Sequence, residues 1–304
     1  MPEVTRIIIN ENISGQRLDN FLLNQLKGVP KSKVYSIIRK GEIRINSKRK
    51  KPSYKLVIGD EVRVPPIKTS SRENQFIPTN IVGLLRDSIV EENDDYIALN
   101  KPEGIASHGG SGISIGVIET IRNFGKSYRD AKLVHRLDKD TSGCQVIAKN
   151  NKFLRSCNKL ISERKVKKTY QAIVHGNWIY KDGIYEINIE KNMLIGKERM
   201  VRISEGGKIA KTFFKVIESS KHFSLIQCEL ITGRTHQLRV HLSELGFPIV
   251  GDKKYGIKEN KFSKGSGYSK RMYLHANSFI SKELNIHLNV KPPKEFKKIL
   301  KNDE

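Results

Sequence analysis

The sequence contains little cysteine and no long apolar segment. Its 304 residues include three scattered cysteines, Cys144, Cys157 and Cys228, and no C-x-x-C pair. An odd, dispersed set predicts buried free thiols rather than a disulfide framework, which fits a reducing compartment. No run approaches the roughly 18 apolar residues of a membrane span, and the first residues lack the apolar core of a secretory signal. We therefore expect a cytoplasmic protein without a membrane partner.

Acidic residues are scarce relative to basic ones. The chain has 56 Lys and Arg against 32 Asp and Glu, so its formal net charge is +24. Such an excess costs self-repulsion and predicts a polyanionic partner. The abundance of Ile, Lys and Asn also fits an AT-rich genome, which would raise the lysine content without a function. The clustering of the basic residues favours nucleic acid.

Motifs for metals and organic cofactors are missing as well. The patterns G-x-x-x-x-G-K-[ST], G-x-G-x-x-G and H-E-x-x-H do not occur. His236 and His241 are five residues apart, a spacing that places them on different faces of either a helix or a strand. We therefore expect neither a metal nor a cofactor.

Residues 13–65 are predicted to form a small unit of their own. Apolar residues at helical spacing predict helices in "SGQRLDNFLLNQLKG" and "PKSKVYSIIRKGE", and alternation predicts strands in "IRIN" and "KLVIGDEVRVP". Between residues 31 and 51, nine Lys and Arg stand against one acid, Glu42. A solvated helix face is the alternative, but this imbalance favours a phosphate-binding surface.

This segment resembles the S4 RNA-binding domain. The similar residues are Arg17-Leu18-Asp19, "SKVYSIIRKGEIRIN" and "GDEVRV". The resemblance implies structured RNA as the partner and no chemistry in this part of the chain. The basic residues expected to contact RNA are Arg17, Lys33, Arg39, Lys40 and Arg44.

Residues 66–87 are polar and are interpreted as a linker that can include a short helix, and residues 88–300 as a second domain. Strands are predicted in "SIVEENDDYIALNK", "CQVIAKN", "KTYQAIVHG", "AKTFFKVIES", "FSLIQCELI" and "MYLHANSFI". Helices are predicted in "IGVIETIRN", "KFLRSCNKLISER" and "THQLRVHLSELG". Because strands outnumber helices and few βαβ alternations occur, the class expected is α+β with a mostly antiparallel mixed sheet and flanking helices.

Two carboxylates lie in one short turn of "LVHRLDKDTSGCQVIAKN" (133–150). A glycosidase-like pair of Asp138 and Asp140 is one interpretation, although glycosidases usually take their two carboxylates from separate elements. The sequence "DTSG" is also typical of a turn, in which Asp140 bonds backbone N–H groups and Gly143 takes a positive φ. Asp138 is then the reactive candidate, with a structural turn cap as its alternative role.

Two further segments carry candidate residues. A helix predicted from an N-cap at Thr235, with Leu238 and Leu242 on its apolar face, places Arg234 at the helix entrance. A bidentate pair of Arg234 with Asp138 would keep the carboxylate ionised, whereas a plain surface cation is the alternative. Tyr170 begins a strand after a basic run, and its spacing alone fits an ordinary strand aromatic.

Taken together, these segments resemble the RluA-type family of RNA pseudouridine synthases. The matching motifs are "LNKPEG" (99–104), "HRLDKDTSG" (135–143), Lys168-Thr169-Tyr170, "GRTHQLRVHL" (233–242) and "LHA" (274–276). The resemblance implies the pseudouridine synthase fold and the cofactor-free conversion of RNA uridine to pseudouridine. With an S4 domain in front, it implies 23S ribosomal RNA or a pre-50S particle as the partner.

The resemblance also implies roles for individual residues. Asp138 acts on the glycosidic bond, Arg234 pairs with it, and Tyr170 stacks on the flipped uracil and is a candidate for the later removal of the C5 proton. Arg136 occupies the gap left by the extruded base. The remaining candidates for RNA contact are His135, with a larger structural share, and Lys101, Lys168 and Arg239.

Two other functions remain open from the sequence. A non-catalytic RNA-binding protein or ribosome-assembly factor on the same fold would explain the charge and the S4-like segment equally well. The presence of Asp138, Tyr170 and Arg234 favours the enzyme, because binding polyanionic RNA does not require an aspartate. A sugar-cleaving hydrolase is a weaker alternative. We expect a monomer.

Overall fold

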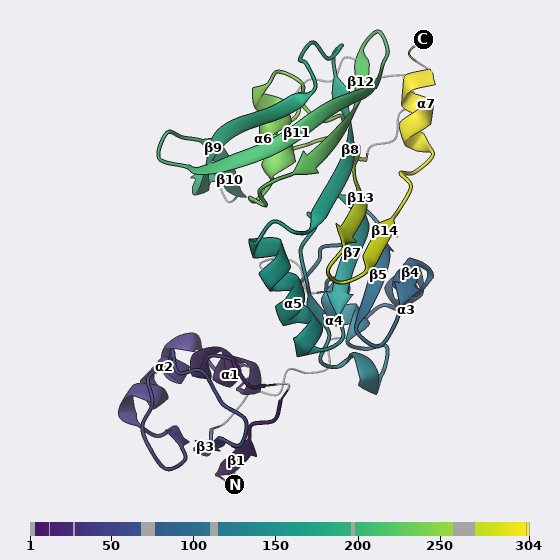
Figure 1. Cartoon of the computed structure of the whole chain (residues 1–304). Coiled ribbons are helices and arrows are strands. Elements are labelled where there is room, and N and C mark those ends of the chain that lie inside the picture. Colours follow the sequence, from purple (N-terminus) through teal and green to yellow (C-terminus); the bar gives the residue numbers. More distant parts are fainter. Residues whose placement is uncertain are drawn as a thin grey trace. The chain divides into compact units, whose positions relative to one another are not determined.

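The chain divides into two compact units, Met1–Phe76 and Ile77–Glu304 (Figure 1). The structure is a computed structural model and describes residues 4–11, 13–26, 28–67, 77–109, 115–195, 198–257, 271–301 and 303. Residues 68–76 of the predicted linker lie outside this part. Residues 79–87 of that linker form a helix whose Leu85 is buried in the second unit. The domain limits 13–65, 66–87 and 88–300 stay predictions.

The first unit packs two helices against a small antiparallel sheet. Its elements are β1 (Thr5–Ile8), α1 (Leu18–Gln25), α2 (Lys31–Lys40), β2 (Arg44–Ile45) and β3 (Glu61–Val64). The sheet order is β1-β3-β2. Phe21 and Leu22 of α1 and Ile37 of α2 are buried in one apolar cluster with the strands. Gly41 ends α2 in the left-handed conformation (φ 71°), which glycine adopts without steric cost.

The second unit is built on one long sheet with helices beside it. Its helices are α3 (Thr79–Asp87), α4 (Val117–Ile121), the 3₁₀ turn η1 (Lys126–Tyr128), α5 (Asn151–Ser162), α6 (Gln237–Glu244) and α7 (Glu295–Lys301). Its strands are β4 (Ile89–Glu92), β5 (Tyr96–Lys101), β6 (Lys132–Leu133), β7 (Ser142–Ala148), β8 (Lys167–His175), β9 (Gly183–Ile195), β10 (Glu198–Ile203), β11 (Lys208–Ser219), β12 (Phe223–Leu230), β13 (Leu274–Ser281) and β14 (Ile286–Asn289).

The strand order of this sheet brings distant segments together. The described strands run β10-β9-β11-β12-β8-β13-β7-β5-β4, with β14 on β13 and β6 on β7. Among these described strands, every pairing is antiparallel except that of β13 with β7. The predicted α+β class with a mostly antiparallel mixed sheet is therefore confirmed. The β9–β10 hairpin is an addition that the sequence did not predict.

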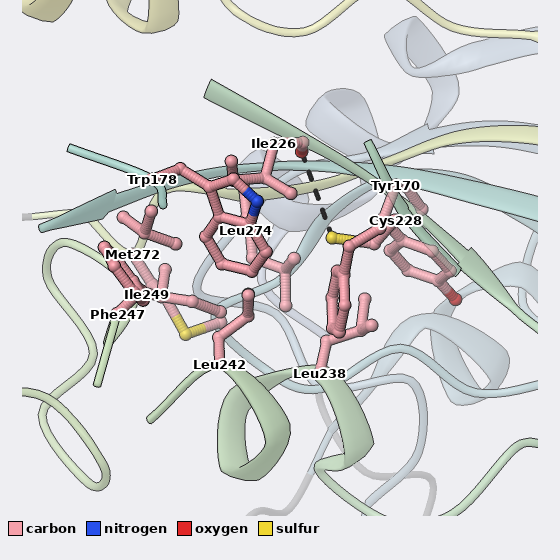
Figure 2. Close-up of a cluster of buried hydrophobic side chains, with 14 of the residues drawn as sticks. Tyr170, Trp178, Ile226, Cys228, Leu238, Leu242, Phe247, Ile249, Met272 and Leu274 are labelled. Carbon is pink, nitrogen blue, oxygen red and sulfur yellow. Dashed lines mark hydrogen bonds between the residues drawn. The ribbon is translucent and has the colours of Figure 1, made fainter. Parts of the chain in front are cut away.

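Helix α6 attaches to the sheet through a buried apolar cluster (Figure 2). Leu238 and Leu242 project from α6 toward strands β8 and β12, and the Tyr170 ring lies at one end of the cluster. This helix and its apolar face were predicted, but the prediction of an N-cap at Thr235 is wrong. The N-cap is His236, which has left-handed backbone angles and makes no capping bond through its side chain.

Two expectations from composition can be compared with the structure. Cys144, Cys157 and Cys228 are all free and buried, as predicted. Among the residues that the structure describes, no helix combines the length and apolar character needed to cross a membrane.

The parallel pairing of β13 with β7 depends on Gly143, which lies within β7 rather than in the preceding turn as predicted. Its φ of +109° confirms the predicted positive φ. A Cβ added at this position would lie 2.2 Å from the backbone oxygen of Ala276. Gly143→Ala should therefore reduce the free energy of unfolding by about 3 kcal/mol, because the clash and the disfavoured φ act together. Urea denaturation of the full chain measures this loss.

Gly83→Ala is the matched control, because Gly83 lies within α3 and a Cβ there meets nothing within 4 Å. This variant should be neutral or more stable by up to about 1 kcal/mol. Equal stabilities for the two variants would show that the close approach at Gly143 is not a constraint.

Candidate active site

Asp138 lies in a short segment that is fixed on both sides. On one side, the Leu137 N–H donates to the Ser107 hydroxyl at 2.9 Å, and that hydroxyl donates to the Leu137 carbonyl at 2.7 Å. On the other side, Lys101 Nζ donates to the Lys139 carbonyl at 3.2 Å. Both anchors are buried, so the backbone that presents Asp138 is held by the interior of the domain.

Lys101 does not have the RNA-facing position that the sequence predicted. Its side chain is fully buried, and its ammonium also donates to the carbonyls of Pro102 at 2.7 Å and Ile105 at 2.8 Å. Burial lowers the pKa of Lys101 to about 7, an effect that the charges of Asp140 and Asp138 oppose. Lys101 thus holds the backbone of the segment around Asp138 from the interior of the domain. Because it is buried, it cannot reach a phosphate.

The carboxylate of Asp138 is bound by Arg239. Arg239 Nη1 donates to Asp138 Oδ2 at 3.0 Å, and the Asp138 side chain remains 30% exposed. The other nitrogens of the same guanidinium bind Asp252, with Nε at 2.7 Å from Oδ2 and Nη2 at 2.8 Å from Oδ1. A bidentate carboxylate fixes the plane of a guanidinium, so Asp252 aims Arg239 at Asp138.

Asp252 is a buried anion that depends on this arrangement. Its side chain is 1% exposed. Burial raises the pKa of Asp252, but the hydrogen bonds and charge of Arg239 and the N–H groups of Lys254 and Tyr255 outweigh burial, so the net pKa is lowered. The carboxylate is therefore ionised at neutral pH and stays paired with Arg239.

The predicted pairing of Arg234 with Asp138 is wrong. Arg234 Nε donates to the carbonyl of Ile209 on β11 at 3.2 Å, while its backbone N–H donates to Gln237 Oε1 at 2.9 Å. Gln237 is buried and also donates to the carbonyl of Lys211 at 2.9 Å, which fixes the turn before α6. Arg239 lies in the first turn of α6 instead, and this position directs its side chain toward Asp138.

Asp140 also differs from its predicted role. It is exposed, and within the described ranges its carboxylate caps no backbone N–H. The Thr141 N–H donates instead to the backbone oxygen of Asp138, at 3.2 Å. The turn is therefore closed by the main chain.

A cleft of about 1290 Å³ opens over Asp138. This volume exceeds the roughly 300–1,000 Å³ of typical small-molecule pockets. Its described lining carries nine Lys and Arg side chains against three acidic ones, which suits a polyanion. The candidate residues that line it are His135, Arg136, Asp138, Lys168, Tyr170, Arg234 and Arg239.

Strand β8 contributes Lys168 and Tyr170 to one wall of the cleft. These residues are two apart, so they face the same side of the strand, while Thr169 on the other side shares a hydrogen bond with Ser278 at 2.5 Å. Burial lowers the pKa of Lys168 and raises the pKa of Tyr170. The Tyr170 hydroxyl is therefore protonated at neutral pH, which favours a stacking role over that of a phenolate base.

The His135 ring is packed into the interior, although the residue also contributes to the lining of the cleft. Its Nε2 accepts the Val146 N–H at 3.1 Å, and its ring stacks on Phe279 with centroids 5.2 Å apart. Burial lowers the pKa of His135 to about 3, so the ring is neutral. The sequence predicts a role for His135 that is more structural than RNA-binding, and these contacts agree with that prediction. Arg136, the next residue, is exposed at the cleft.

The basic residues of the first unit form a separate surface. Lys33, Arg39 and Lys40 of α2 are exposed and Arg44 of β2 is half-buried. Within the described part of the chain, none of these four forms an ion pair. Arg17 instead binds Asp19 with both Nε (3.1 Å) and Nη2 (2.6 Å), and this hydrogen bonding lowers the pKa of the Asp19 carboxyl.

Sequence reasoning missed three residues of this site, Asp252, Tyr255 and His236. Asp252 and Tyr255 lie in "GDKKYG" (251–256), a turn bounded by two glycines. An aspartate between turn glycines was a usable signal for the first. His236 was considered only as a metal ligand, and among the described residues no group of His, Cys, Asp and Glu suits a metal ion.

Two protein families match the sequence of this chain. Residues 95–244 match the family described as RNA pseudouridylate synthase, and residues 16–62 match the S4 domain. Over 279 residues the chain is 45% identical to ribosomal large subunit pseudouridine synthase C of Salmonella typhimurium, a match that covers 90% of this chain and 88% of that protein. The chain therefore belongs to the RNA pseudouridine synthase family and carries an N-terminal S4 domain, which confirms the resemblance seen in the sequence.

Other relatives extend this result. Ribosomal large subunit pseudouridine synthase C of Escherichia coli K12 is 45% identical over 280 residues, and that of Pasteurella multocida is 44% identical over 98% of this chain and 93% of its own length. The solved structure of human RNA pseudouridylate synthase domain containing 4 is 27% identical, with a TM-score of 0.61 over 73% of this chain and 95% of its own.

The Asp138–Arg239–Asp252 chain predicts that Arg239 is required for stability. Arg239→Gln should reduce the free energy of unfolding by about 3 kcal/mol, because it leaves Asp252 as a buried anion without its cation. Urea denaturation of the full chain measures this effect.

Two controls accompany this variant. Arg234→Gln should change stability by no more than about 0.5 kcal/mol, because Arg234 pairs with no carboxylate among the described residues. The double variant Arg239→Met/Asp252→Leu should regain much of the loss, since no buried charge remains. Similar losses for Arg239→Gln and Arg234→Gln would contradict the assignment.

Proposed function

We propose that the protein isomerises uridines of large-subunit ribosomal RNA to pseudouridine, with Asp138 as the carboxylate that acts on the ribose. The observation that carries the proposal is Asp138 itself, half-exposed in a basic cleft and bound by an arginine that a second, buried aspartate orients. The named relatives supply the class of RNA, because they are large-subunit pseudouridine synthases.

The reaction conserves every atom of the nucleotide. The bond from C1′ to N1 breaks, a bond from C1′ to C5 forms, and the proton lost from C5 is balanced by the proton gained at N1. No electrons leave the nucleotide, so no redox cofactor is required. Asp138 serves either of two routes, addition to C1′ or removal of the C2′ proton, and both require an ionised and oriented carboxylate.

The uridine must leave its base stack to reach Asp138. Tyr170 offers a flat, uncharged ring at the wall of the cleft, on which the extruded uracil stacks. Arg136 is exposed two residues before Asp138, and its planar guanidinium occupies the gap that the uracil leaves. Lys168 is a half-buried cation on the same wall as Tyr170 and contacts the RNA backbone.

The first unit adds affinity without chemistry. Its exposed cations Lys33, Arg39 and Lys40, together with Arg44, neutralise phosphates of structured rRNA. We further propose that the protein acts as a cytoplasmic monomer without a metal or organic cofactor. The buried free thiols are compatible with that reducing compartment.

The first test maps pseudouridine by carbodiimide modification and primer extension on unmodified 23S rRNA. New stops are expected with the wild-type protein and none with Asp138→Asn, which has the same shape but lacks the carboxylate. Binding of RNA by Asp138→Asn should be unchanged or tighter, because one anion is removed from the cleft. Filter binding measures this affinity.

The other outcomes separate the alternatives. Binding without stops on 23S rRNA or on other RNAs would replace the proposal with an RNA-binding assembly factor. Release of free uracil would indicate a hydrolase. Loss of RNA binding in a folded Asp138→Asn protein would contradict the role given to Asp138.

The second test concerns the basic surface of the first unit. Replacing Lys33, Arg39, Lys40 and Arg44 together by alanine should reduce the slope of log Kd against log salt by roughly 3, because each neutralised phosphate contributes about 0.7–0.9. The matched control replaces four exposed lysines near the C-terminus, Lys291, Lys294, Lys297 and Lys298. Equal changes in the two variants would show a general effect of charge.

A further inference from the structure

His236 has an unusual backbone next to the reactive carboxylate. It adopts the left-handed conformation, with φ 52° and ψ 22°, immediately before α6. Its Nε2 lies 3.8 Å from Asp138 Oδ2. Non-glycine residues in this conformation are uncommon and concentrate where the surrounding structure holds them for a function. The distance is too long for a hydrogen bond in the free protein, but such contacts often tighten in the substrate complex.

Tyr255 holds the other side of the His236 ring. Tyr255 Oη lies 2.8 Å from His236 Nδ1 and accepts the Val201 N–H at 3.1 Å. A phenol has one proton to donate. Within the described residues, His236 Nδ1 is the acceptor that lies within hydrogen-bond distance of that proton. The Tyr255 hydroxyl therefore donates to Nδ1, and a neutral His236 carries its own proton on Nε2, the nitrogen nearest Asp138.

The ring of His236 is neutral at neutral pH. Burial lowers the pKa of His236, and the opposing effect of the Asp138 charge does not restore it. The alternative tautomer would place the lone pair of Nε2 close to the Asp138 carboxylate and leave the Tyr255 proton without its acceptor. Both the hydrogen bonding and the electrostatics select the tautomer with its proton on Nε2.

The two donors near Asp138 lie at the same oxygen. Arg239 Nη1 is 3.0 Å and His236 Nε2 is 3.8 Å from Oδ2. In the part of the chain that the structure describes, no donor is placed at Oδ1. The carboxylate thus has one oxygen facing donors of the protein and one available to a substrate.

We propose that His236, held by Tyr255 as the tautomer with its proton on Nε2, is a positioning residue that acts with Arg239 on Oδ2 of Asp138 and leaves Oδ1 to meet the ribose. The inference rests on the proposed function, which it deepens. It also assigns two orienting residues to the turn at residues 251–256. Asp252 orients Arg239, and Tyr255, three residues later, orients His236. The Tyr255 N–H donates to Asp252 Oδ1 at 3.1 Å, so the two orienting residues are themselves connected.

The first test reads the tautomer directly and does not depend on activity. Long-range proton–nitrogen NMR correlations are recorded on the full-length protein with ¹⁵N-labelled histidine, and the His236 signals are assigned by their loss in His236→Asn. Asparagine suits this purpose because it tolerates the left-handed backbone. We expect a protonated Nε2 and an unprotonated Nδ1 in the wild type, and a shift toward the other tautomer in Tyr255→Phe. A protonated Nδ1 in the wild type would overturn the proposal.

The second test measures the single-turnover rate of pseudouridine formation and the Kd for RNA separately. His236→Asn and Tyr255→Phe should each lower the rate about tenfold while the Kd changes less than about twofold, since orienting partners act through the reactive group rather than on binding. Tyr180→Phe is the matched control, because it removes a partly buried phenol that donates to the backbone carbonyl of Leu245 rather than to His236, and it should keep the wild-type rate.

The outcomes distinguish this inference from the proposed function. Wild-type rates in both variants, or a loss confined to RNA affinity, would contradict the positioning role even if the wild type forms pseudouridine. A wild type that forms no pseudouridine on any RNA would contradict the proposed function, while the NMR experiment would still decide the tautomer of His236.

Discussion

The site depends on a row of three charges, Asp138, Arg239 and Asp252. A single guanidinium lies between two carboxylates, one buried and one open to the cleft. The buried Asp252 determines the orientation of Arg239, and Arg239 determines that of Asp138. Because each of the three lies on a different segment, their mutual attraction also joins the turn after β6, the helix α6 and the loop that follows it.

Around this row, the domain uses buried polar side chains to hold the main chain. Lys101 donates hydrogen bonds to three carbonyl oxygens, and the Ser107 hydroxyl is hydrogen-bonded to the backbone of Leu137. Gln237 accepts the Arg234 N–H and so fixes the turn before α6. Each is a buried group with partners that satisfy its hydrogen-bonding capacity, so the loops of the site are as well determined as its strands. The partly exposed carboxylate of Asp138 is therefore held in a fixed orientation at the cleft.

Much of this arrangement could be predicted from the sequence. Apolar spacing identified α1, α2, α5 and α6 and most strands of the sheet, because burial on one face leaves a period in the chain. The residue types and turn pattern around Asp138 singled out that carboxylate, whereas Tyr170 was identified only through the resemblance to the family. The choice between Arg234 and Arg239 could not be made, since both belong to one motif and only the three-dimensional course of the turn before α6 separates them. Asp252 is remote from the motifs in sequence, and its contact with Arg239 arises from folding alone.

The position of β13 has a consequence for synthesis of the chain. This strand lies between β8 and β7, although residues 274–281 are made long after both of them. Until they emerge, β7 and β8 each have an open edge, and the sheet that supports Asp138 and Tyr170 is incomplete. The nascent chain therefore completes this sheet only after residues 274–281 have been made, and its long-range pairing makes the second unit the slower part to fold.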